Sequence, residues 1–142
     1  MSDAYQGDEF MGYAPFINFI GSTYIVAVSG ARWNPCGHML LNTGGIGGWY
    51  FHICERKGFP HCMDQAGYER YLLENRKIEI YRRYVPISNP TAAKRKLTEL
   101  LNQKWRWFVL PNNCVHFVEE VVQAGGANFG LYSNCPAIEV PK

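Results

Sequence analysis

Apolar and aromatic residues alternate with glycine-rich segments in the first half of the chain, a pattern typical of short antiparallel strands. The apolar run that begins at Tyr24 predicts a buried strand, and a second strand is expected at 37–42. The glycine-rich segment 43–47 predicts a turn, and the aromatic segment 48–54 predicts the returning strand of a hairpin. Two further strands and one irregular stretch are expected, at 77–85, 105–110 and 55–63 respectively.

Two helices are predicted in the middle of the chain. Asp64 is a suitable N-cap for the first, and Asn89 followed by Pro90 places a cap directly before the residue most favoured at the first helical position. In both helices apolar residues recur three and four positions apart, and the second helix is expected to end near 104. These positions are Tyr68, Tyr71 and Leu72 in the first helix and Ala93, Leu97, Leu100 and Leu101 in the second.

A third helix is predicted after Pro111, with Asn112 or Asn113 as its N-cap and the pair Gly125–Gly126 at its end. Its apolar positions share one face and include a cysteine in the first turn. They are Cys114, Val118, Val121 and Val122. The mixture of hairpin strands and separate helices predicts an α+β fold.

Length and composition indicate one globular domain, 1–142, with 1–12 flexible and a central unit at about 24–124. Hydrophobic residues make up 47% of the chain and charged residues only 18%, which excludes a disordered protein. The formal net charge of +2 is too small to indicate a nucleic-acid-binding protein.

The sequence predicts neither a secretory signal peptide nor a membrane-spanning helix. The segment 1–9 carries three acidic residues and no basic one, and no apolar run approaches the roughly 18 residues that a spanning helix needs. We therefore expect a protein that is cytoplasmic as synthesised, and any export would be signal-independent.

The five cysteines form an odd set in a chain without a signal peptide, which favours thiols over a disulfide framework. They are Cys36, Cys54, Cys62, Cys114 and Cys135. A thiol in the first turn of a helix lies near unpaired backbone N–H groups and the positive end of the helix dipole, and both favour the thiolate. Cys114 is therefore the candidate nucleophile, and its pKa is expected to lie well below that of an ordinary thiol.

Hairpin geometry selects the candidate base among the four histidines. If the hairpin loop is centred on Gly45, His38 and His52 face each other across the two strands, on the same side of the sheet. Two facing imidazoles suit a relay in which His38 takes the thiol proton and His52 orients it. A loop centre shifted by one residue would still leave the two rings close together but would weaken the case for a relay.

The hexapeptide Asn-Cys-Val-His-Phe-Val at 113–118 resembles the Asn-Cys-Glu-His-Phe-Val signature of the lecithin:retinol acyltransferase-like proteins. These are a circularly permuted branch of the papain-like NlpC/P60 superfamily, and His38, His52 and Cys114 match the order of its catalytic residues. The resemblance implies a papain-like fold, with a small antiparallel sheet packed against the helix that bears the nucleophile.

The activity that the resemblance implies is a cysteine hydrolase or acyltransferase that acts on an amide or ester carbonyl and uses no cofactor or metal. The expected substrates are a cell-wall peptide or a lipid acyl group. A small hydrolase of this kind would also suit a toxin or effector delivered to another cell, for which a protein inhibitor would be a partner.

Four alternatives stay open. The first is a non-catalytic binding module in which Cys114 and the histidines are core residues, and the second is a zinc site built from His52, Cys54, His61 and Cys62. Cys36 is a second candidate nucleophile. The fourth alternative is that the basic, tryptophan-containing stretch 94–107 binds an anionic membrane surface. The remaining histidine, His116, is expected to be a hydrogen-bonded core residue.

Overall fold

The computed structural model describes residues 4–9, 23–30, 37–44, 48–53, 57–103, 105–106 and 112–127. In this part the chain forms an α+β fold with an antiparallel sheet in the order β1-β6-β4-β3-β2-β7, a separate β5–β8 pair and three helices. The strands are β1 (Asp8–Glu9), β2 (Thr23–Val28), β3 (His38–Asn42), β4 (Tyr50–His52), β5 (Lys57–Gly58), β6 (His61–Met63), β7 (Glu79–Val85) and β8 (Trp105–Arg106). The helices are α1 (Gln65–Glu74), α2 (Pro90–Leu101) and α3 (Asn112–Ala124).

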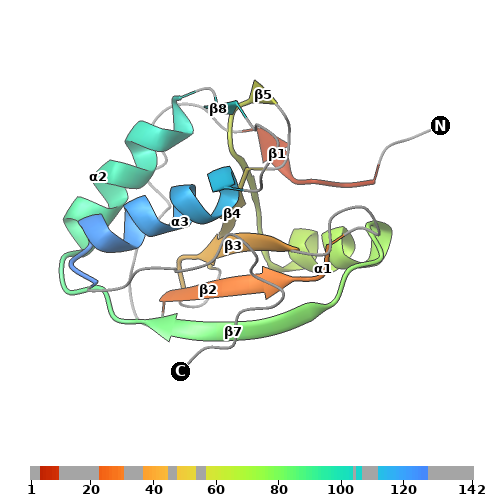
Figure 1. The fold of residues 1–142 in the computed structure, drawn as a ribbon. Helices are drawn as coiled ribbons and strands as arrows, with labels where there is room; N and C mark the ends of the chain where they lie inside the picture. Colours follow the sequence, from red (N-terminus) through yellow and green to blue (C-terminus); the bar gives the residue numbers. More distant parts are fainter. Residues whose placement is uncertain are drawn as a thin grey trace.

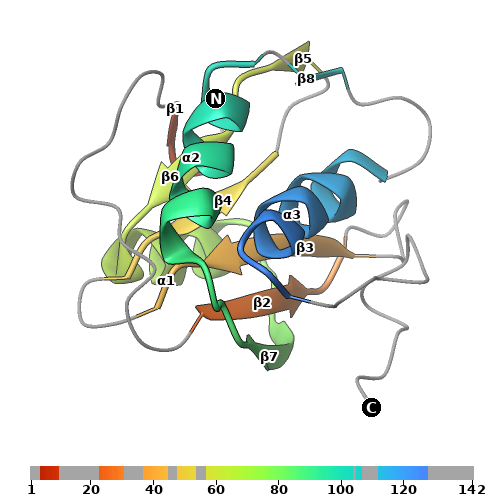
Figure 2. The ribbon, with the colours of Figure 1, turned by 90° about the vertical axis from the view of Figure 1, so that its left-hand side faces the viewer.

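Helices α2 and α3 lie side by side on one face of the sheet (Figures 1 and 2). They enclose an apolar core of aliphatic and aromatic side chains, in which Met39 and Leu41 of β3 pack with Phe117 of α3. Because side chains of a strand alternate between its two faces, Ile25 of β2, Met39 and Leu41 of β3 and Phe51 of β4 contribute to this core. We call this side of the sheet the α3 face.

Helix α1 covers the opposite side of the sheet, which we call the α1 face. Val26, Leu40 and Tyr50 of the sheet pack there against two tyrosines of α1. The rings of Tyr50 and Tyr68 stack with their centroids 4.0 Å apart. The α1 face is therefore richer in aromatic rings and hydroxyl groups than the α3 face.

The helix caps form where the sequence predicts them for α1 and α2. The side chain of Asp64 accepts a hydrogen bond from the Gly67 N–H at 2.7 Å, and that of Asn89 accepts one from the Ala92 N–H at 3.1 Å. At the end of α3, Gly126 has a φ of 93°, the left-handed conformation that glycine adopts without steric cost.

Several boundaries differ from the predictions. Helix α2 ends at Leu101 and not near 104, and α3 already begins at Asn112, so both Asn112 and Asn113 lie inside the helix and neither is its N-cap. The segment 55–63, expected to be irregular, contributes β5 and β6. Strands of two or three residues are too short to show a periodic pattern, which explains why the sequence does not reveal them.

The described part of the N-terminal segment, 4–9, is packed against the sheet and not frayed as expected. Strand β1 pairs with β6, and the Tyr5 N–H donates a hydrogen bond to Glu74 at 2.9 Å. The side chain of Gln6 donates another to Asn75 at 2.6 Å. The prediction of a flexible segment from its polar composition was therefore wrong, because these polar groups form hydrogen bonds with partners about 70 positions away in the chain.

Among the described helices, none combines the length and the apolar character needed to cross a bilayer.

Candidate functional site

Cys114 lies in the first turn of α3, where the sequence predicts it, and is only 1% exposed. The helix packs with its apolar face on β3 and β4. The backbone N–H of Met39 hydrogen bonds to the Cys114 thiol. Because Met39 directly follows His38, this contact brings the candidate nucleophile to the start of the strand that carries the candidate base.

The sheet leaves room for this contact. The pairing of β3 with β4 joins Leu41 to Phe51 and Asn42 to Tyr50, and in the described residues it does not extend to Met39. At that level Met39 pairs with Ala27 of β2, and its N–H hydrogen bonds to the Cys114 thiol. The candidate site therefore lies where the described pairing of two neighbouring strands ends, with Cys114 on the α3 face and the two histidines on the α1 face.

His38 and His52 form the imidazole pair that the hairpin geometry predicts, although the register differs. The pairing of Leu41 with Phe51 centres the loop one residue later than Gly45, so the two histidines are diagonal neighbours and not directly opposed. A shift of this kind keeps both side chains on one face of the sheet. His38 Nε2 and His52 Nδ1 lie 2.9 Å apart, within hydrogen-bonding distance.

The protonation pattern of the pair follows from a third group. His52 Nε2 lies 2.7 Å from the backbone carbonyl of Gln6, which can only accept, so His52 carries its proton on Nε2. In neutral His52 the Nδ1 atom is then an acceptor, and His38 Nε2 must donate to it. Neutral His38 is left with a lone pair on Nδ1, which is the atom able to accept a proton from a thiol.

Burial keeps both imidazoles neutral. His52 is fully buried, and desolvation lowers its pKa from 6.5 to about 4. Desolvation also lowers the pKa of His38 well below 6.5, and the neighbouring His52 and Lys77 lower it further. At neutral pH both imidazoles are therefore uncharged, which is the form that a general base requires.

The expectation of an acidic Cys114 thiol is wrong for this structure. The backbone N–H groups of Met39, Val115 and Cys114 lower its pKa, but desolvation outweighs them and raises the pKa to about 11. Position in the first helical turn favours the thiolate only where solvent or a cation also stabilises it, and Cys114 is almost fully buried. At neutral pH the thiol and both imidazoles are therefore uncharged.

Lys77, between α1 and β7, is a residue that the sequence analysis missed. Its ammonium group donates a hydrogen bond to the Ser29 carbonyl at 2.8 Å, and its charge lowers the pKa of Cys114, His38 and His52. No sequence signal marks it, because its role depends on the approach of two segments 48 positions apart. The Gln6 carbonyl was also missed, because every residue has a backbone carbonyl and nothing in the sequence marks this one.

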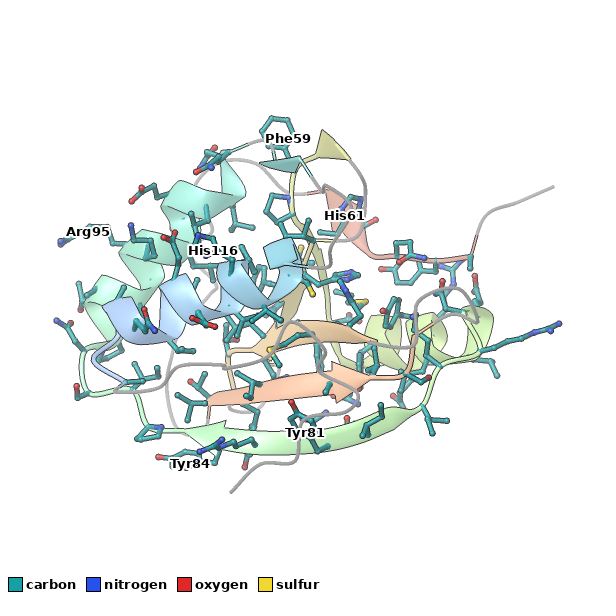
Figure 3. All side chains as sticks on the ribbon, in the orientation of Figure 1. Phe59, His61, Tyr81, Tyr84, Arg95 and His116 are labelled. Atoms are coloured by element: carbon teal, nitrogen blue, oxygen red, sulfur yellow. The ribbon has the colours of Figure 1, made fainter. Side chains whose placement is uncertain are left out.

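The other sequence candidates lie elsewhere or serve other purposes. His61 is buried on β6 beside His52, their ring centroids 6.4 Å apart. His116 was expected in the core, but its side chain is 61% exposed on the side of α3 turned away from the sheet, 3.6 Å from Glu120 (Figure 3). A residue two positions after Cys114 faces away from it, so solvent and not the core surrounds this imidazole.

No cluster of three or more His, Cys, Asp or Glu residues that could hold a metal ion occurs in the described ranges. Cys62 is buried and its pKa is raised to about 11 by desolvation and by Asp8 and Asp64. Cys36, Cys54 and Cys135 lie outside the described residues, as do Lys104 and Trp107 of the basic stretch. Of that stretch, Arg95 is exposed on α2 (Figure 3).

Comparisons with protein-family models, with curated proteins and with solved structures find no match to this chain.

Proposed function

We propose that this protein is a cysteine-dependent hydrolase or acyltransferase with Cys114 as nucleophile, His38 as general base and His52 as the residue that orients it. The observation that supports this most strongly is the chain of hydrogen bonds from His38 through His52 to the Gln6 carbonyl, because it leaves His38 Nδ1 as a proton acceptor. A pair of hydrogen-bonded imidazoles with an assigned proton order, one buried and one half-buried, is an arrangement that catalysis requires and that simple packing does not.

In the proposed reaction the Cys114 thiol attacks the carbonyl carbon of an amide or ester while His38 Nδ1 takes the thiol proton. The proton then passes to the leaving amine or alcohol, which departs as the acyl-thioester forms. Water or an acceptor hydroxyl or amine attacks the thioester, His38 removes its proton, and the thiol is restored. Because thiol and imidazole are neutral at rest, proton transfer accompanies the attack and does not precede it.

His52 stabilises the protonated form of His38 through the same hydrogen bond. Once His38 is an imidazolium, its Nε2–H donates a charge-assisted hydrogen bond to His52 Nδ1, which is stronger than the neutral one. The N–H groups of Cys114 and Met39, which hydrogen bond to the thiol, are suitable donors for the oxyanion of the tetrahedral intermediate. The second oxyanion donor, which the sequence does not indicate, would then be Met39.

The resemblance of 113–118 to the lecithin:retinol acyltransferase-like proteins supports a papain-like assignment of the α+β fold. It also makes a cell-wall peptide or a lipid acyl group the leading substrate, and a delivered toxin or effector a fitting role. Val115 stands where that family has Glu, so the proposal covers the thiol chemistry of the family and not one lipid substrate.

An acyl-transfer assay tests this proposal. Incubation with a p-nitrophenyl ester, followed by peptide mass mapping, should find the acyl group on Cys114 of the wild type and at least tenfold less of it in His38→Ala. Cys62 is an internal control, because it is similarly buried and has a similarly raised pKa. His116→Ala is the matched variant, since its exposed imidazole lies on α3 away from the sheet.

A non-catalytic binding module is the second candidate, and the burial of Cys114 favours it. A thiol that is 1% exposed with a pKa of about 11 has the properties of a core residue. In that case Cys114 and Cys62 would be acylated equally slowly, and His38→Ala would change neither rate. Screening of peptidoglycan fragments and phospholipids would follow only from the first result.

A further inference from the structure

Lys77 places a positive charge beside the candidate site. Its ammonium group donates to the Ser29 carbonyl at 2.8 Å, and Ser29 directly follows Val28, the residue paired with His38 across β2 and β3. The side chain is half-buried, and its charge acts on the thiol as well as on both imidazoles. The ammonium group therefore lies at the end of β2 next to His38, and its charge reaches the thiol as well as both imidazoles.

Several backbone hydrogen bonds hold Lys77 in this place. The Ser29 N–H donates to the Ile78 carbonyl at 2.9 Å, and the Ile78 N–H donates to the Ser29 hydroxyl at 3.0 Å. The Lys77 N–H donates to Leu72 at 2.8 Å as part of the C-terminal cap of α1. The position of the ammonium group is thus built into the junction of α1 with β7.

The acidic residues nearest to Lys77 in the sequence form ion pairs and hydrogen bonds with other residues. Glu74 forms an ion pair with Arg70 and accepts from the Tyr5 N–H. Glu79 accepts from the Tyr68 hydroxyl at 2.8 Å and pairs with Arg82 at 2.8 Å. In the described parts of the chain, no carboxylate lies within ion-pair distance of Lys77.

An ammonium group has three N–H donors, and the Ser29 carbonyl accepts from one of them. A half-buried cation beside neutral groups is poorly compensated and favours an anion in its neighbourhood. The candidate mechanism also creates a second positive charge, the His38 imidazolium, close to the first. A bound anion would offset the repulsion between the two charges.

We infer that Lys77 binds a carboxylate of the substrate close to the carbonyl under attack, so that the enzyme prefers anionic acyl compounds to neutral ones. This inference rests on the proposed function for its kinetic part, although carboxylate binding does not depend on turnover. An acyl peptide with a nearby free carboxylate is a substrate of this class, and a neutral fatty acyl ester is not.

Binding is tested with N-acetylglycine and its neutral amide, N-acetylglycinamide, added to ¹⁵N-labelled protein. N-acetylglycine should produce saturable shifts of the His38 ring signals. It should also raise the His38 pKa, because it neutralises the charge on Lys77 without displacing His52 or Cys114. The amide should produce neither effect. Lys77→Met should abolish the response, and Lys96→Met, which removes a lysine from α2, should leave it intact.

Turnover is tested with p-nitrophenyl hemisuccinate and p-nitrophenyl butyrate, which have similar lengths but differ in charge. The wild type should favour the anionic ester by about tenfold in kcat/KM, Lys77→Arg should keep most of this preference, and Lys77→Met should lose it. An unchanged preference in Lys77→Met, or N-acetylglycine binding that survives in this variant, would overturn the inference.

The two tests separate the inference from the proposed function. If the wild type binds N-acetylglycine through Lys77 but hydrolyses neither ester, the carboxylate site is supported and the proposed hydrolase is wrong. If it hydrolyses both esters equally through Cys114, the hydrolase is supported and the role of Lys77 is wrong.

Discussion

The two faces of the sheet are stabilised by different kinds of interaction. On the α3 face, aliphatic side chains and Phe117 pack with Cys114 in an apolar core. On the α1 face, His52 and the tyrosines are buried together with hydrogen-bonding groups that need partners, and Arg82 donates to the Tyr50 hydroxyl at 2.7 Å. The α3 face is therefore stabilised by packed volume, and the α1 face by the completeness of its hydrogen bonds.

The difference explains the properties of the candidate site, which lies between the faces. The apolar side raises the pKa of the thiol, and the polar side fixes the proton order of the two imidazoles through the Gln6 carbonyl. A site assembled in this way has a well-defined geometry but a resting nucleophile that is protonated. In the proposed hydrolase, activation of the thiol would have to come with the substrate and not from the helix terminus alone.

The largest expected effect is loss of packing on the α3 face. Phe117 is fully buried between α3 and the sheet, so Phe117→Ala should lower the free energy of unfolding by about 3 to 5 kcal/mol through a cavity that the helices cannot close. Urea unfolding followed by circular dichroism measures the change. A loss below about 1 kcal/mol would mean that the α3 face is not a tightly packed core.

The next effect is the acid sensitivity of the α1 face. The pKa of His52 is 6.5 when unfolded and about 4 when folded, so the unfolded chain binds more protons between these values. Above pH 6.5 this difference contributes about 3 kcal/mol to the free energy of unfolding, and the contribution is lost as the pH falls from 6.5 to 4. Urea unfolding at several pH values, with His52→Gln as the comparison, isolates it; parallel curves for the two proteins would contradict it.

A smaller effect is expected at Arg82, whose guanidinium joins the tyrosines of the α1 face to Glu79. Arg82→Met removes the hydrogen bonds to Tyr50 and Glu79 and should cost about 1 to 2 kcal/mol of unfolding free energy. Arg95→Met is the control, because Arg95 is exposed on α2 and its loss should change stability by less than about 0.5 kcal/mol. Equal effects in both variants would show that the network does not stabilise this face.

The smallest effect is a gain. Arg76 has a φ of 54° at the end of α1, a left-handed conformation that costs energy for any residue with a Cβ. Arg76→Gly should therefore raise the free energy of unfolding by about 1 kcal/mol, measurable as a higher thermal midpoint. Unchanged or lower stability would indicate that the arginine side chain makes a compensating contribution.

Sequence reasoning worked best where one segment carries its own signal. The caps at Asp64 and Asn89, the first-turn position of Cys114 and the glycine end of α3 all follow from local preferences of a few residues. The shared face of His38 and His52 also followed, because an even change of register leaves side-chain alternation intact.

It failed where the outcome depends on neighbours that are distant in the chain. Strands β5 and β6 exist because β8 and β4 pair with them, and short segments without such partners would not be strands. The pKa of Cys114 was misjudged because a local helix effect was weighed without the burial that opposes it. His116 was misplaced because it was assigned to the core, although the apolar positions that share a face with Cys114 lie on the other side of the helix.

Local pattern was thus sufficient for the α+β class, the main helices and strands, and the choice of Cys114, His38 and His52 as candidates. Packing alone set the proton order of the imidazoles, the neutral resting thiol and the position of Lys77, since each depends on a long-range contact with Gln6, Met39 or Ser29. Helix and strand preferences act over a few residues, whereas desolvation and hydrogen bonding between segments arise only once the chain is folded.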